Sequence, residues 1–99
     1  MSLPLEGLKV LAFEQYGAGP FGSQYLSDLG AEVIKIEPAG TDGDYLRALG
    51  PYFIDEERNS ASSIFFQALN RNKKSITLNI LSAEGKDILG KLVKTSDAV

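Results

Sequence analysis

Residues 9–37 read KVLAFEQYGAGPFGSQYLSDLGAEVIKIE, and their pattern indicates the class of fold. The apolar run at residues 9–13 predicts a buried strand, and a second apolar run predicts another strand at residues 31–37. Between them lie a glycine-rich turn and a helix. Pro20 is a suitable residue for the first turn of this helix, and Gly30 is a suitable residue to end it. Apolar side chains recur in this helix at helical spacing: Phe21, Tyr25, Leu26 and Leu29. A strand, a helix and a strand of this length predict a right-handed parallel crossover.

The following segments continue the alternation of helix and strand. Residues 38–61 are rich in glycine, proline and charged residues and predict a long loop, with a short helix near residues 45–49. Residues 62–69 are expected to form a short helix. Residues 75–79 alternate between polar and apolar types, which predicts a third strand. Ser82 has the right type and position for the N-cap of a last helix.

The last three residues, 97–99, predict the beginning of a fourth strand. A domain that ends as a strand begins is expected to be a piece of a longer protein. The whole pattern predicts an incomplete α/β fold with a parallel sheet, in which residues 1–99 belong to one domain.

The composition excludes several classes of function. The 99 residues include no Cys, which excludes disulfides and thiolate nucleophiles, and no His, which excludes a serine–histidine hydrolase or a His-ligated zinc enzyme for this chain alone. The net charge of −3 argues against nucleic-acid or membrane-surface binding. No apolar run is long enough to span a bilayer, and residues 1–7 lack the features of a signal peptide. A cytoplasmic protein is expected.

The glycine-rich turn matches the pattern Gly-x-Gly-x-x-Gly at Gly17, Gly19 and Gly22, and Glu37 ends the next expected strand. Glycines let the backbone approach a pyrophosphate, a helix N-terminus supplies N–H donors, and an acid accepts a hydrogen bond from a ribose hydroxyl. One interpretation is therefore the NAD-binding half of an oxidoreductase, although Pro20 removes one N–H donor. The other interpretation is a tight turn that the α/β fold needs for itself.

A second candidate is a basic turn between the expected helix and strand: Asn70, Arg71, Asn72, Lys73 and Lys74. Arginine suits a phosphate as a bidentate donor, and lysine suits it as a point charge. The alternative is a solvated basic turn. The glycine-rich turn follows a strand, whereas the basic turn enters one, so the two turns share a ligand only if it is long or if the chain pairs with a second copy.

Other polar residues receive a less specific interpretation. The five acids of the expected loop are interpreted as a solvated surface in preference to a catalytic site: Asp42, Asp44, Asp55, Glu56 and Glu57. Arg47 is expected to be exposed, with a phosphate contact as the alternative. Gln15 and Tyr16 flank the glycine-rich turn, where they either line a ligand pocket or cap the end of the sheet.

Several segments, in order and with matching spacing, resemble one known family. They are distributed over nearly the whole length of the chain: residues 5–11, 18–37, 40–47, 70–79, 84–85 and 97–99. The chain is similar to the N-terminal segment of the class III coenzyme A transferases (CaiB/BaiF-like), the group that contains formyl-CoA transferase and α-methylacyl-CoA racemase. The resemblance accounts for the basic turn and for Pro20, which the dinucleotide pattern does not.

The resemblance implies a Rossmann-like parallel sheet with flanking helices, of which this chain would be the N-terminal part of a larger CoA-binding domain. It also implies homodimers of interlocked subunits. The transferases of this family move CoA between an acyl-CoA and a carboxylic acid through an aspartyl–CoA thioester, without a metal, and that aspartate lies beyond Val99. The resemblance thus implies no catalytic residue in this chain, which alone would be inactive. A racemase, which works by proton transfer, is the alternative within the family.

The resemblance further implies which residues contact CoA. Tyr16, Gly17 and Ala18 match positions near the pantetheine arm and the thioester. The basic turn matches a family turn near the adenosine and the phosphates: Asn70, Arg71, Asn72, Lys73 and Lys74. Two positions depart from the family pattern, because formyl-CoA transferase has glutamine in place of Gly17, and Pro38 stands where an arginine often meets the CoA phosphates.

Overall fold

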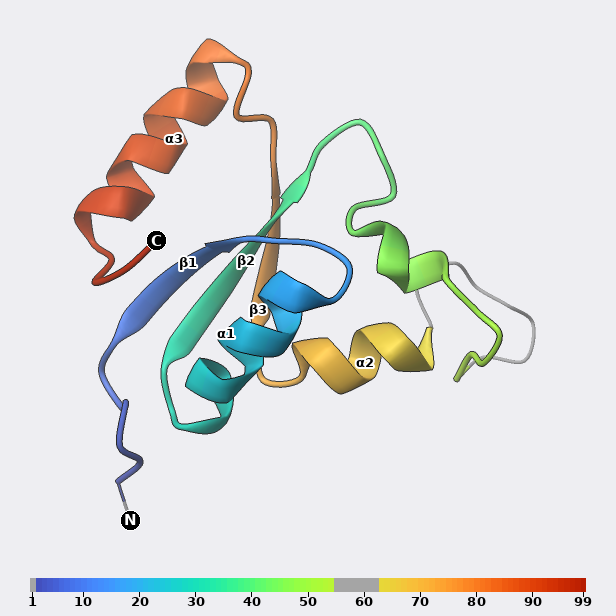
Figure 1. Ribbon diagram of the computed structural model, residues 1–99. Helices are drawn as coiled ribbons and strands as arrows, with labels where there is room; N and C mark the ends of the chain where they lie inside the picture. Colours follow the sequence, from blue (N-terminus) through green and yellow to red (C-terminus); the bar gives the residue numbers. More distant parts are fainter. Residues whose placement is uncertain (1, 55–62) are drawn as a thin grey trace.

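The computed structural model describes residues 2–54 and 63–99, and helices and strands alternate along it (Figure 1). The strands are β1 (Lys9–Phe13), β2 (Glu32–Pro38) and β3 (Lys74–Leu78). The helices are α1 (Ala18–Asp28), the 3₁₀ helix η1 (Tyr45–Ala48), α2 (Ile64–Asn70) and α3 (Ala83–Lys94). The strands are parallel and lie in the order β1-β2-β3, so the predicted α/β fold with a parallel sheet is confirmed.

The β1–α1–β2 unit is the predicted parallel crossover. β1 and β2 pair directly, with Val10 opposite Val33. The chain turns from α1 into β2 at Gly30, which has a φ of +106° and whose Cβ, if one were added, would lie 2.6 Å from the Cβ of Leu3. Glycine is therefore required at this position, as predicted for the end of the helix, because it has no side chain and adopts a left-handed backbone freely.

Different helices cover the two faces of the sheet (Figure 1). On one face α3 packs over an apolar cluster: Leu11, Ile34, Ile36, Ile76, Leu78, Leu89 and Leu92. On the other face α1 packs over a second apolar cluster: Leu5, Val10, Ala12, Leu26, Ala31 and Val33. Side chains alternate between the two faces along a strand. Lys35 and Glu37 of β2 therefore lie on the same face as Val33, so two charged residues are built into the interior.

The C-terminal residues continue the sheet beside β1. Ala98 forms a parallel bridge with Val10, and its carbonyl oxygen accepts a hydrogen bond from the Leu11 N–H at 3.0 Å. The predicted beginning of a fourth strand is thus present. Because β2 and β3 lie on one side of β1 and Ala98 lies on the other, the strand order reverses at β1. In open α/β sheets, ligands bind outside the carboxyl ends of the strands at such a reversal.

The predicted element boundaries agree closely with the structure. η1 occupies the position expected for a short helix in the long loop, whereas residues 55–62 lie outside the described residues. α2 ends at Asn70 and β3 begins at Lys74, so the turn between them is two residues shorter than predicted. Ser82 is the N-cap of α3 as predicted, and its hydroxyl accepts the Gly85 N–H at 2.9 Å. No helix within the two described ranges is long and apolar enough to cross a membrane.

Candidate functional site

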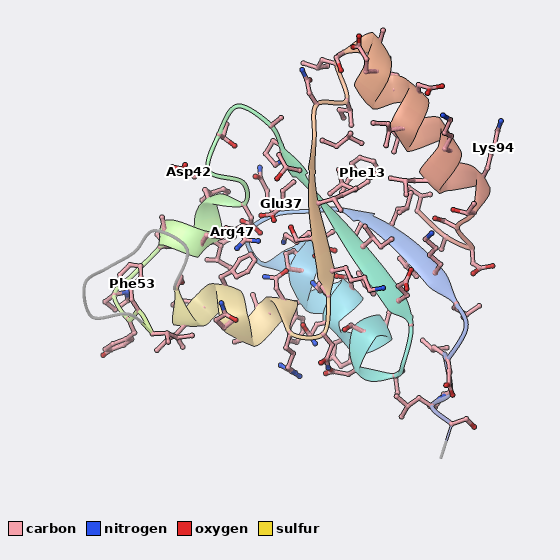
Figure 2. All side chains as sticks on the ribbon, turned by 180° about the vertical axis from the view of Figure 1, so that it is seen from behind. Phe13, Glu37, Asp42, Arg47, Phe53 and Lys94 are labelled. Carbon is pink, nitrogen blue, oxygen red and sulfur yellow. The ribbon has the colours of Figure 1, made fainter. Side chains whose placement is uncertain are left out.

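A pocket of about 400 Å³ lies at the carboxyl ends of all three strands. Its walls come from the last residues of each strand and those that follow: Phe13, Glu14, Gln15, Ile36, Glu37, Pro38, Ala39, Leu78, Asn79, Ile80 and Leu81. Figure 2 shows Phe13 on the side of the sheet that α3 covers. The pocket occupies the position at which an α/β sheet is expected to bind a ligand. Its largely apolar lining suits an uncharged part of that ligand.

The glycine-rich turn follows β1 beside this pocket. Tyr16 has a φ of +68°, in the left-handed region, and Gly17 is the N-cap of α1 without a side-chain cap. Only Gly19 of the three motif glycines packs closely against the protein, since an added Cβ would lie 2.9 Å from the Cβ of Glu14. Gly17 and Gly22 face open space. The close approach of α1 to the end of β1 therefore explains why residue 19 is a glycine, but it does not explain the other two glycines of the motif.

Glu37, the acid predicted to accept a ribose hydroxyl, is already bound within the protein. Arg47 lies beside it (Figure 2) and donates to both carboxylate oxygens, from Nε to Oε1 at 2.8 Å and from Nη2 to Oε2 at 2.6 Å. The Asp44 N–H donates to Oε1 at 2.8 Å, and the Ser75 hydroxyl donates a short hydrogen bond to Oε2. Burial raises the pKa of Glu37, but these hydrogen bonds and the Arg47 charge lower it to about 2. A carboxylate with four donors has little capacity left for a ribose.

A cluster of five polar residues, which we call the buried lysine network, lies on the same face of the sheet: Glu14, Lys35, Asp44, Asn70 and Lys73. The Lys35 ammonium donates to Asp44 Oδ2 at 2.6 Å and to Asn70 Oδ1 at 2.9 Å. The Lys73 ammonium donates to Glu14 Oε2 at 2.8 Å and to Asn70 Oδ1 at 3.2 Å. The four charged side chains are at most 5% exposed. Two cations and two anions thus balance one another, as buried charges require.

Two loop residues differ from their predictions. Asp44 was expected in a solvated surface, but it is fully buried, and besides Lys35 it accepts the Tyr16 N–H at 3.1 Å. Arg47 was expected to be exposed, but its guanidinium lies 4.0 Å from the centre of the Phe66 ring in addition to pairing with Glu37. Asp42 is exposed as predicted, whereas three acids lie outside the described residues: Asp55, Glu56 and Glu57. Long-range partners, which the local sequence does not show, explain both errors.

Lys73 is the interior member of the basic turn. Its side chain is 1% exposed, and its ammonium also donates to the Pro20 carbonyl oxygen at 2.9 Å. Burial lowers the pKa of Lys73, an effect that the Glu14 pair opposes. A wholly solvated basic turn is therefore the wrong description. Through Lys73 the basic turn reaches the first turn of α1 and hence the glycine-rich turn.

Arg71 and Lys74 are the exposed cations of the basic turn. Each forms an ion pair, Arg71 with Asp28 at 2.6 Å and Lys74 with Glu32 at 2.8 Å. Asn72 stands between them in the left-handed region, with a φ of +63°. Both ion pairs lie near the amino ends of β2 and β3, whereas the large pocket lies at the carboxyl ends. As the sequence predicts, one ligand contacts both places only if it is long or if the chain pairs with a second copy.

Tyr16 and Gly17 line a second pocket, of about 140 Å³, between the glycine-rich turn, η1 and α2. Its other walls are apolar: Leu46, Leu49, Phe65 and Leu69. The Tyr16 ring stacks on Tyr45, with ring centres 5.3 Å apart and an angle of 14°. Ala18 is the first residue of α1. The structure therefore brings together Tyr16, Gly17 and Ala18, and it separates them from the exposed cations of the basic turn.

Sequence reasoning did not identify the pocket walls after β3 or the buried lysine network. Residues 78–81 could have been found from their place at the carboxyl end of the strand predicted at residues 75–79. The signal for the network was the alternation of Val33, Lys35 and Glu37, which places two charges on one face of a strand expected to be buried. Among the described residues, no cluster of three or more His, Cys, Asp or Glu side chains could hold a metal ion.

Comparisons with curated proteins find CoA-transferases. The chain is 45% identical over 94 residues to human succinyl-CoA:glutarate CoA-transferase, and the aligned region covers 95% of this chain and 20% of that protein. It is 42% identical over 97 residues to formyl-CoA:oxalate CoA-transferase of Escherichia coli, and the aligned region covers 98% of this chain and 22% of that protein. The chain therefore spans about a fifth of the length of these relatives.

Solved structures and a family model agree with these relatives. A CAIB/BAIF family protein from Brucella suis matches with a TM-score of 0.85 and 43% identity, over 98% of this chain and 25% of that one. The predicted fold, the N-terminal part of a larger α/β structure, is confirmed by this match. The model of CoA-transferase family III matches residues 5–99. This chain belongs to CoA-transferase family III.

Proposed function

We propose that this chain is the N-terminal part of an acyl-CoA:carboxylate CoA-transferase and that it contributes to the CoA-binding site. Its relatives, which are CoA-transferases by name, support the class of reaction. The observation that carries the binding role is the pocket at the carboxyl ends of β1, β2 and β3, beside the point where the strand order reverses.

Acyl-CoA has a long pantetheine arm with a thioester at one end and an adenosine with its phosphates at the other. The apolar pocket suits the pantetheine arm, and the glycine-rich turn continues from its wall toward the thioester region. There Tyr16, Gly17 and Ala18 are the proposed contacts, and the first N–H groups of α1 favour negative charge. This helix has no acidic residue in its first turn to compete for them.

The basic turn is the proposed contact for the phosphate end, through Asn70, Arg71, Asn72, Lys73 and Lys74. Arg71 and Lys74 have the exposed charges in this set, and each would exchange an exposed ion pair for a phosphate. Lys73 would act from the interior, because its ammonium is held between Glu14 and Pro20. Asn70 and Lys73 would thus fix the turn that carries the exposed cations.

In the proposed reaction, the carboxylate of an aspartate outside residues 1–99 attacks the acyl-CoA thioester and forms a mixed anhydride while CoA leaves as a thiolate. The thiolate attacks the aspartyl carbonyl, which gives an aspartyl–CoA thioester and releases the first acid. The acceptor carboxylate then attacks this thioester, and the thiolate attacks the acyl carbonyl of the second anhydride, so the aspartate is regenerated. This chain would contribute binding and no covalent step. The proposal extends to an interlocked homodimer of the whole subunit in the cytoplasm, without nucleic acid, membrane or metal.

The two other functions considered from the sequence have less support. The NAD-binding alternative needs a free carboxylate at Glu37, which is bound to Arg47 and Ser75. The racemase alternative has no support among the relatives named above, which are transferases.

Calorimetric titration of the chain with CoA, and separately with NAD at the same salt concentration, tests the proposal. We expect CoA to bind and Ile80→Glu, which places a charge in the pocket wall, to weaken binding at least tenfold. The matched control is Val93→Glu, another partly exposed apolar residue, on α3 outside the pocket. Binding of NAD without CoA would contradict the proposal, and so would equal effects of the two variants.

A further inference from the structure

The backbone of Tyr16 adopts a conformation that its own side chain disfavours. Its φ of +68° lies in the left-handed region, where a residue with a Cβ is less stable than in the right-handed one. Glycine would adopt this conformation freely, but tyrosine needs an external partner that holds it there. The structure provides one: the Tyr16 N–H donates to Asp44 Oδ1 at 3.1 Å, across 28 residues of sequence.

Asp44 is itself held from several directions. It is fully buried, and Oδ1 also accepts the Leu46 N–H at 2.9 Å. Oδ2 accepts a hydrogen bond from the Lys35 ammonium at 2.6 Å, and the Asp44 N–H donates to Glu37 Oε1 at 2.8 Å. With these partners the carboxylate has one position, so the atom that meets Tyr16 is fixed relative to the sheet.

The residue after Asp44 holds the side chain of Tyr16. Tyr45 stacks on the Tyr16 ring at a centre-to-centre distance of 5.3 Å. One short segment therefore holds both the backbone and the ring of a residue that lines the small apolar pocket. This arrangement fixes the wall of the pocket before any ligand arrives.

We propose that Asp44 is a positioning residue, which holds Tyr16 in its left-handed conformation and thereby preorganises the Tyr16–Gly17 turn for CoA. The inference rests on the proposed function, because it assumes that this turn meets CoA. A turn that is already in its binding conformation binds more tightly, since affinity falls with the fraction of molecules that are in that conformation. Lys35 serves the same role indirectly, by neutralising and orienting Asp44.

The test must separate the acceptor role of Asp44 from its charge, because a single change would leave Lys35 buried and unpaired. We compare two double variants of the full chain, Lys35→Met/Asp44→Asn and Lys35→Met/Asp44→Ala. Both remove the same ion pair, but only the asparagine keeps an oxygen that can accept the Tyr16 N–H. Each is also made with Tyr16→Gly, because glycine adopts the left-handed conformation without a partner.

CoA affinity is measured by calorimetry for all four variants. The two variants that keep Tyr16 are also compared by the strong intraresidue amide–Hα NOE that a positive φ produces at this residue. We expect alanine in place of asparagine to remove the NOE from Tyr16 and to lower CoA affinity about tenfold, the size of a left-handed backbone penalty. In the Tyr16→Gly background the difference should fall below about twofold, because the lost acceptor no longer matters.

The inference is overturned if the NOE of Tyr16 persists in Lys35→Met/Asp44→Ala, or if alanine lowers affinity equally in the Tyr16→Gly background. The second result would assign the effect to the Leu46 N–H or to general stability. If the unmodified chain binds no CoA, the proposed function fails, whereas the NOE comparison still decides whether Asp44 holds the turn.

Discussion

The two faces of β2 are built from opposite kinds of side chain. On the face that α3 covers, Ile34 and Ile36 join an apolar cluster. On the face that α1 covers, Lys35 pairs with Asp44, and Glu37 is paired equally closely with an arginine of the same loop. Residues that are neighbours in sequence therefore have entirely different surroundings, because side chains alternate between the faces of a strand.

The two faces of β2 contribute in different ways to the structure. Apolar burial is non-directional, so the α3 face contributes stability and accepts changes that conserve volume. Ion pairs and hydrogen bonds are directional, so the charged face fixes the loop after β2 and the turn at Tyr16 relative to the sheet. A buried ion pair is weak as a source of stability but strongly destabilising when one partner is removed.

The largest expected effect is from breaking one buried ion pair. Lys35→Met should lower the free energy of unfolding by about 3–5 kcal/mol, because the Asp44 carboxylate is left buried without a cation. Urea denaturation measures the change. The control is Lys74→Met, which breaks the exposed pair with Glu32 and should leave the midpoint unchanged. Equal shifts for the two variants would mean that the charged face is not specially sensitive.

A large-to-small change on the opposite face should cost somewhat less. Leu11 is 1% exposed, so Leu11→Ala should lower the free energy of unfolding by about 3 kcal/mol through lost burial and a residual cavity. Urea denaturation at low and high salt should give the same loss, because screening acts on charges and not on apolar contacts. A loss that depends strongly on salt would contradict the division between the faces.

The charged face should also produce a specific acid sensitivity. The folded-state pKa of Glu37 is lowered to about 2 from 4.5, so its pairing stabilises the protein above about pH 4.5 and is lost as the pH falls toward 2. The loss should amount to roughly 1–2 kcal/mol after solvent screening, and Glu37→Gln should remove this part of the pH dependence. Unfolding midpoints between pH 2 and 6 measure it. Glu32→Gln, at an exposed pair, should change the profile less.

The smallest expected effect concerns the exposed part of the basic turn. Arg71→Ala should leave stability unchanged and lower CoA affinity about twofold to fivefold, the effect of one exposed charge on a phosphate. The effect should shrink with added salt. Calorimetric titration at two salt concentrations measures it, and unchanged affinity at low salt would remove Arg71 from the proposed phosphate contacts.

Much of the fold follows from local patterns. The apolar runs predicted β1 and β2, and Gly30 and Ser82 marked helix boundaries that the structure confirms. Residues 97–99 predicted the beginning of a further strand, and Ala98 forms a parallel bridge with β1. These features depend on periodicity and on backbone geometry within a few residues, which a sequence displays directly.

The buried lysine network could not be predicted in the same way. Glu14 and Lys73 are 59 residues apart, and Asp44 looks like an ordinary loop acid until Lys35 and Tyr16 reach it. Burial of a charge depends on partners that only the complete fold brings together. Similarly, the pocket walls after β3 are mostly apolar and carry no motif, so only the parallel topology places them beside the ends of β1 and β2 at the candidate site.

Chemical-shift mapping of the ¹⁵N-labelled chain during a CoA titration shows whether CoA binds at the carboxyl ends of the strands. We expect shifts that cluster at the carboxyl ends of the strands, in residues 13–18 and 78–81, with smaller shifts in the basic turn. Shifts confined to the basic turn, or no shifts under conditions in which the chain is folded, would contradict this expectation.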